Sequence, residues 1–188
     1  MNQQADRENI DIQLLRMIRS RLQQGAQVMI RVNGRSMLPL LKPNDAILLE
    51  SVQPEQLMPG DIITIVCDGV LLTHRFCGYR FDARHPPLLL TRGDRQLILD
   101  PPHTYEQLVG QVVIRQRGHL HLQHGIGYRL NHFINWVFTR THSIETVLKK
   151  DADHFDTPPA RHIWGHLIRF GAFRVTTLVT KVVDLLPT

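Results

Sequence analysis

Hydrophobic residues follow two different spacings along this chain, one near its two ends and another between them. From residue 9 to residue 24, apolar residues recur every three or four positions, and a glycine follows at position 25. This spacing, closed by a glycine, predicts one amphipathic helix that packs on the rest of the molecule. The apolar stripe of this helix consists of Ile10, Leu14, Met17, Ile18 and Leu22.

Between residues 27 and 124 the apolar residues form short runs separated by Pro, Gly, Asn and Asp, a pattern typical of strands and turns. The pair Asp68-Gly69 is a strong hairpin signal, and a two-residue turn there places His74 opposite Ile63. Many short strands joined by such turns predict a mainly β domain that is coiled and barrel-like. The predicted strands cover 28–32, 46–50, 61–67, 70–76, 88–91, 108–115 and 119–123.

After Gly127 the helical spacing returns. A helix is predicted around 130–138, a polar linker at 149–157, and a second amphipathic helix from about 161 to 186. The last helix carries His166, Arg169 and Lys181 beside its apolar residues, so it packs on the body or a partner, or it lies at a membrane surface. The predicted organisation is an N-terminal helix (1–26), a β domain (27–124) and a helical C-terminal extension (125–188).

Length and composition narrow the function classes. A chain of 188 residues forms one or two domains and can bury a core. The net charge of +5 suits anionic lipid or an acidic peptide and does not call for a nucleic-acid partner. No apolar run reaches the roughly 18 residues of a membrane span, and residues 1–9 are polar, so we expect no transmembrane segment and no secretory signal. The expected location is cytoplasmic or peripheral to a membrane.

The two cysteines, Cys67 and Cys77, flank the predicted hairpin. The hairpin register does not make them cross-strand neighbours, so no disulfide is expected. Two unpaired thiols favour a reducing compartment.

Candidate chemistry begins at Ser36, in the run Gly34-Arg35-Ser36-Met37-Leu38-Pro39, which comes just after the predicted strand at 28–32. A serine hydroxyl needs a base to become a nucleophile, and His74 on a neighbouring strand can supply one. Histidine has a reference pKa of about 6.5, so neutral imidazole is present at neutral pH. Asp94 and Asp100 follow, and either carboxylate could orient the imidazole.

Taken together, these motifs resemble the signal peptidase I superfamily of serine endopeptidases. The form resembled is the archaeal and endoplasmic-reticulum one, which has histidine where most bacterial members have lysine. The matching segments are Gly-x-Ser-Met-x-Pro around Ser36, the Thr-His-Arg run at His74, and Gly93-Asp94 with Asp100 six residues later. The resemblance covers about 27–113, and the terminal helices lie outside it.

The resemblance implies Ser36 as nucleophile, His74 as general base, Asp100 as the triad acid and Asp94 as a supporting carboxylate. It implies a leader or precursor peptide as substrate, bound as an added strand, with no metal and no organic cofactor. The backbone N–H of Ser36 is the expected oxyanion donor. Many family members add a hydroxyl two residues before the nucleophile, where this chain has Gly34.

Two other functions are compatible with the same fold. A catalytically inactive peptide-binding module would keep the cleft without the chemistry. A self-cleaving repressor of the SOS type would need a DNA-binding module and a lysine base, whereas this chain offers a single N-terminal helix and His74. The intact set of serine, histidine and aspartates favours the enzyme.

Overall fold

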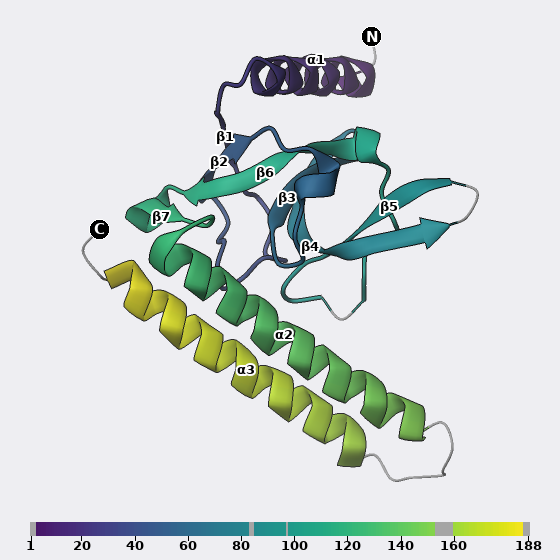
Figure 1. Ribbon diagram of the computed structural model, residues 1–188, viewed down its shortest axis with the longest axis vertical. Coiled ribbons are helices and arrows are strands. Elements are labelled where there is room, and N and C mark those ends of the chain that lie inside the picture. The colour runs from purple at the N-terminus through teal and green to yellow at the C-terminus, as the bar shows by residue number, and fades with distance from the viewer. Residues whose placement is uncertain (1–2, 83–84, 97, 153–159, 186–188) are drawn as a thin grey trace.

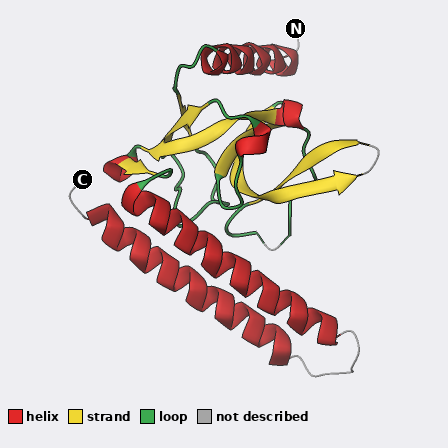
Figure 2. Ribbon diagram, viewed as in Figure 1, coloured by secondary structure: helices red, strands yellow, loops and turns green. Residues whose placement is uncertain are grey.

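The computed structural model describes residues 3–82, 85–96, 98–152 and 160–185, and side chains over 12–81, 86–96, 98–140 and 170–185. Within them the chain forms an antiparallel sheet flanked by long helices (Figures 1 and 2). The helices are α1 (Gln3–Gln23), α2 (Gly125–Ala152) and α3 (Ala160–Leu185), with short 3-10 turns η1 (Pro54–Gln56), η2 (Tyr105–Gln107) and η3 (Arg117–His119). The strands are β1 (Val28–Arg31), β2 (Ala46–Glu50), β3 (Ile62–Cys67), β4 (Val70–Asp82), β5 (His85–Arg92), β6 (Leu108–Arg115) and β7 (Leu120–His121).

The strands pair in the order β1-β2-β6-β3-β4-β5, and β7 pairs with β6. Each of these pairings is antiparallel. Among the described strands β1 and β5 pair on one side only, so the sheet is open. The prediction of a mainly β domain with added helices is confirmed, but the sheet is not the closed barrel that a barrel-like domain suggests. Turn spacing reveals local hairpins, whereas closure depends on pairing between strands distant in sequence.

The β3–β4 hairpin has the register expected from its two-residue turn, with His74 opposite Ile63 and Cys67 opposite Val70. Strand β4 is longer than predicted and changes partner along its length. It pairs with β3 up to Arg75 and with β5 from Arg75 onward. Residues 70–74 therefore have no described strand on the side away from β3.

The buried apolar side chains form two clusters. The larger cluster includes Ile18 and Leu22 of α1 together with Leu130, Ile134 and Phe138 of α2. The smaller cluster consists of Leu57, Ile63, Ile65, Phe76 and Leu89. In Figure 1 the helix α1 lies on one side of the sheet and the α2–α3 hairpin on the other.

The C-terminal extension is more helical than predicted. Helix α2 continues through Ala152, so the first part of the predicted linker is helical, and residues 153–159 lie outside the described residues. The expected helix at 161–186 corresponds to α3, whose end at Leu185 leaves residue 186 undescribed. Cys67 and Cys77 are free thiols, as expected. None of the described helices carries a segment apolar enough to cross a bilayer.

Candidate active site

Ser36 lies in a tight turn that follows β1. The N–H of Leu41 donates to the carbonyl of Met37 at 3.0 Å, which closes the turn just after the serine. Met37, Leu40 and Leu41 are at most 1% exposed and hold the turn in the core. Because the apolar neighbours point inward, Ser36 itself stays half-exposed at the surface of the sheet.

The imidazole of His74 joins Ser36 to Asp100. Its Nε2 lies 2.8 Å from Oγ of Ser36, and its Nδ1 lies 2.6 Å from Oδ2 of Asp100. The His74 side chain is 2% exposed, and its place inside the β3–β4 ladder fixes the direction of the ring. Thr91 of β5 also donates its hydroxyl to Oδ2 of Asp100 at 2.6 Å. The carboxylate is thus held from two sides, with the imidazole directed at the serine.

Asp94 lies apart from this chain of hydrogen bonds and pairs with Arg75. The guanidinium donates to both carboxylate oxygens, at 2.7 and 2.8 Å, and both side chains are 1% exposed. Arg75 also donates to the carbonyl of Gly60 at 2.8 Å and to Oδ1 of Asn131 at 2.5 Å. Asn131 belongs to α2, so this ion pair connects the helical extension to the strand that carries His74.

Gly93 allows Ser36 and His74 to approach each other closely. A Cβ atom at this position would lie 2.7 Å from Cβ of Ser36 and 3.1 Å from Nε2 of His74. The loop is fixed in place because the N–H of Arg95 donates to the Ser36 carbonyl at 2.8 Å. The Gln96 amide oxygen accepts from the N–H of Gly93 at 2.8 Å. A side chain larger than hydrogen at Gly93 would push the serine away from the imidazole.

The environment favours an ionised Asp100. Burial by itself would raise the pKa of this carboxyl, but the hydrogen bonds from His74 and Thr91 outweigh burial and hold the pKa below its usual value. His103 lies close enough for both Asp100 and His74 to affect its pKa, which burial lowers. Its Nε2 is buried without a described partner, in keeping with a neutral ring. A carboxylate that stays charged can stabilise an imidazolium at His74.

The backbone N–H of Ser36 makes no hydrogen bond to another described residue, so it can donate to an external oxygen. At Gly34, a Cβ atom would lie 3.7 Å from Oγ of Ser36 and 4.0 Å from its backbone nitrogen. The position two residues before the serine is therefore adjacent to the expected oxyanion donor, and it bears only hydrogen.

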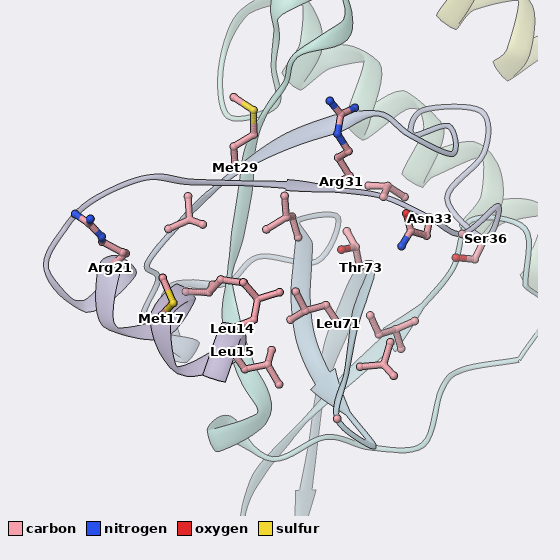
Figure 3. A pocket seen from close by; sticks show the side chains of 18 residues that line it. Leu14, Leu15, Met17, Arg21, Met29, Arg31, Asn33, Ser36, Leu71 and Thr73 are labelled. Carbon is pink, nitrogen blue, oxygen red and sulfur yellow. The ribbon is translucent and has the colours of Figure 1, made fainter. Parts of the chain in front are cut away.

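A cavity of about 720 Å³ extends from Ser36 between β1 and the start of β4 (Figure 3). Residues 28–34 line one side and residues 69–73 the other. Neither facing edge is paired with a described strand across the cavity. Unpaired N–H and C=O groups of this kind are where an extended peptide can add as a strand.

Several residues of the site received no role from the sequence. Arg75 stood in the quoted Thr-His-Arg run, and Thr91 ended a predicted strand. Alternation along a strand could have assigned Arg75 to the face opposite His74. Asn131 carries no local signal, because its partners Arg75 and Gly60 are distant in sequence. His121 and His124 stack at 4.4 Å, and nowhere in the described part of the chain do three His, Cys, Asp or Glu side chains gather as metal ligands would.

The chain matches no protein-family model, and comparison with curated protein sequences gives no significant relative.

Proposed function

We propose that this protein is a serine endopeptidase of the signal-peptidase type that cleaves a leader or precursor peptide through an acyl-enzyme. The observation that carries the proposal is the hydrogen-bonded chain from Ser36 through His74 to Asp100. Its position at the end of a cavity between two unpaired strand edges supports a peptide as the substrate. The relationship to signal peptidases rests on the sequence motifs alone.

The geometry supports a stepwise acyl transfer. Nε2 of His74 takes the proton of Ser36 while Oγ bonds to the carbonyl carbon of the scissile peptide, and the carbonyl oxygen becomes an oxyanion. The N–H of Ser36 donates to that oxyanion. The imidazolium, stabilised by Asp100, returns the proton to the leaving amine as the C–N bond breaks. Water then repeats the sequence on the ester, which frees the acid product and restores Ser36.

Hydrolysis of a proteome-derived peptide library, read by mass spectrometry, tests this function. The wild-type protein should produce new termini, whereas Ser36→Ala and His74→Ala should not. Ser51→Ala is a matched control, because Ser51 is exposed and has no part in the site. Cleavage by Ser36→Ala at the native rate would exclude Ser36 as the nucleophile. If the wild-type protein binds peptides and cuts none, it is a catalytically inactive binding module.

Peripheral membrane contact through α3 is part of the proposal. Phe170, Val175, Leu178 and Val182 of α3 are 51–65% exposed. Arg174 stacks on the ring of Phe170 at 5.2 Å. The described exposed residues of this helix include no carboxylate. The side chains of His166, Leu167 and Arg169 lie outside the described residues. An apolar strip with a cationic edge suits an anionic lipid surface.

A further inference from the structure

The cavity that ends at Ser36 has a third wall, which the proposed chemistry does not require. Two of its walls are the strand edges, and the third is α1, which contributes Leu14, Leu15 and Met17 (Figure 3). In that view Ser36 lies at one end of the cavity and the apolar side chains of α1 lie toward the other. The helix therefore bounds the part of the cavity farthest from the serine.

Helix α1 is fixed to the body by only part of its apolar stripe. Ile18 and Leu22 are 5% and 2% exposed and belong to the core. Arg19 adds a hydrogen bond to the carbonyl of Glu106 at 2.5 Å. In contrast, Leu14 and Met17 are 51% and 66% exposed at the cavity. The core buries only part of the apolar stripe. Covering the exposed part with an apolar ligand would be favourable, because it removes apolar surface from water.

The wall formed by residues 28–34 is long enough to line an extended peptide. The backbone from Val28 to Gly34 that forms one wall is about 20 Å long at the rise of a strand, enough for about six residues of an added strand. The facing edge begins at Val70, which is itself 64% exposed. Because Ser36 stands at one end, a bound peptide would place its scissile bond there and its remaining residues along α1.

The lining of the cavity offers no partner for a cationic side chain. None of the described residues that line it is acidic. In Figure 3 the guanidinium groups of Arg21 and Arg31 point away from its apolar centre, and that of Arg31 donates to the carbonyl of Asn44 at 3.1 Å. A lysine or arginine in the bound segment would therefore lose hydration without gaining a carboxylate partner, whereas an apolar residue would not.

We infer that α1 is the specificity wall of the cleft, and that the preferred substrate has an apolar segment free of basic residues within about six residues of the scissile bond. This inference rests on the proposed function for the meaning of the cleft. Met17 would contact the part of the peptide farthest from the cut, and the strand edges would hold its backbone.

Peptide binding by the Ser36→Ala variant separates this inference from catalysis. The probes are fluorescent twelve-residue peptides, one with a Leu/Ala/Val segment and one with two lysines within that segment. The apolar peptide should bind at least tenfold more tightly than the lysine-bearing one. Adding Met17→Lys should weaken binding of the apolar peptide about tenfold, in line with the burial of one large apolar side chain. Gln13→Lys adds the same charge at an exposed site on the same helix outside the cavity, and should change binding less than twofold.

Each remaining outcome is decisive. Equal binding by the Met17→Lys and Gln13→Lys variants, or no peptide binding at all, would overturn the role of α1. The role of α1 would also be overturned if its exposed side chains formed a dimer interface instead. In that case Met17→Lys would convert a dimer into a monomer, and no peptide would compete with dimer formation. If the wild-type protein binds with the predicted preference but cuts nothing, the cleft assignment stands and the proposed protease function fails. If the wild-type protein cuts peptides and Met17→Lys leaves kcat/KM for the apolar peptide unchanged, the protease stands and the specificity wall fails.

Discussion

At the scale of single residues, His74 and Arg75 are neighbours on β4 whose side chains point to opposite faces of the sheet. Alternation along a strand imposes this arrangement. It explains why two aspartates of one loop region have different partners, since Asp100 meets the imidazole and Asp94 meets the guanidinium. Replacing each of the two aspartates by its neutral amide should therefore affect a different property of the protein.

Asp100→Asn should lower kcat by about 10³–10⁴ with little loss of stability, because the imidazole loses the group that sets its tautomer and stabilises its charged form. Asp94→Asn should lower the free energy of unfolding by about 3–5 kcal/mol, because it leaves the buried charge of Arg75 without its partner. Urea unfolding and single-turnover cleavage by both variants separate the two effects. An unstable Asp100→Asn variant together with a stable, inactive Asp94→Asn variant would reverse the assignment.

Gly34 offers a test by gain of function. A hydroxyl attached at this position would stand beside both Oγ and the N–H of Ser36. Gly34→Ser should raise kcat about tenfold, which is less than the ~10²–10³ that a fully aligned oxyanion donor contributes. Gly34→Ala adds the carbon without the hydroxyl and serves as the control. Equal rates in the two variants would show that the oxyanion does not lie on this side of Ser36.

At the scale of elements, features that depend on residues close together in the sequence were predicted better than features that depend on distant residues. The Asp68-Gly69 turn fixed the β3–β4 register, and strands β2 and β6 occupy their predicted residues. The partner change along β4 was not predictable, because it depends on β5 returning to pair beyond Arg75. The helical stripe of α1 was visible in the sequence, but its division between core and cavity depends on the position of β1.

The same contrast holds for the candidate site. Ser36, His74 and the aspartates stood out because each lies in a short motif next to a strand or turn. Asn131 did not, since its partners Arg75 and Gly60 lie more than fifty residues away in the sequence. Side chains that hold a site from another element have no local pattern, so the sequence alone did not assign them.

Asp45 connects the turn before β2 to η3 and makes stability sensitive to acid. Burial would raise the pKa of its carboxyl, but hydrogen bonds from Arg117 and the N–H of Lys42, together with the charge of Arg117, hold the pKa below the usual value. A carboxyl with a depressed folded-state pKa stabilises the fold above its unfolded value of about 3.9, and this contribution is lost as pH falls through the folded value.

We therefore expect the wild-type protein to be more stable than Asp45→Asn by a constant amount above about pH 5, and the difference to shrink below about pH 4. Urea unfolding across this range measures it. Glu55→Gln, at an exposed carboxylate, serves as the control. A difference that stays the same at pH 3 would show that the ionised form of Asp45 is not what stabilises the turn.

At the scale of the whole molecule, α3 combines a tether to the body with an exposed outer face. Asp184 pairs with Arg115 and Arg117, which also donate to the carbonyl of Leu40 in the serine turn. The opposite face of α3 presents its apolar residues to solvent. Contact of that face with a membrane would hold the β domain and its candidate site close to the lipid surface.

The full-length protein should co-sediment with vesicles that contain anionic lipid at low salt and be released as salt rises, because charges more than about 10 Å apart are screened near 0.1 M. Leu178→Glu should abolish this binding, since it puts a like charge into the apolar strip. Phe81→Glu is the control, because Phe81 is also exposed but lies on β4, away from α3. Vesicle binding that is unchanged in Leu178→Glu, or absent in the wild-type protein, would contradict the membrane contact.

The most direct test of the central claim, that His74 activates the side chain at position 36, needs no substrate. In a Cys67→Ser, Cys77→Ala background, Ser36→Cys places a thiol next to the imidazole, and its alkylation rate by iodoacetamide can be followed against pH. A thiol paired with histidine has a lowered pKa, so alkylation should persist at pH 6, well below the ~8.5 of an ordinary cysteine, and His74→Gln should abolish this reactivity. An alkylation profile centred near pH 8.5 that is the same with and without His74 would contradict the account.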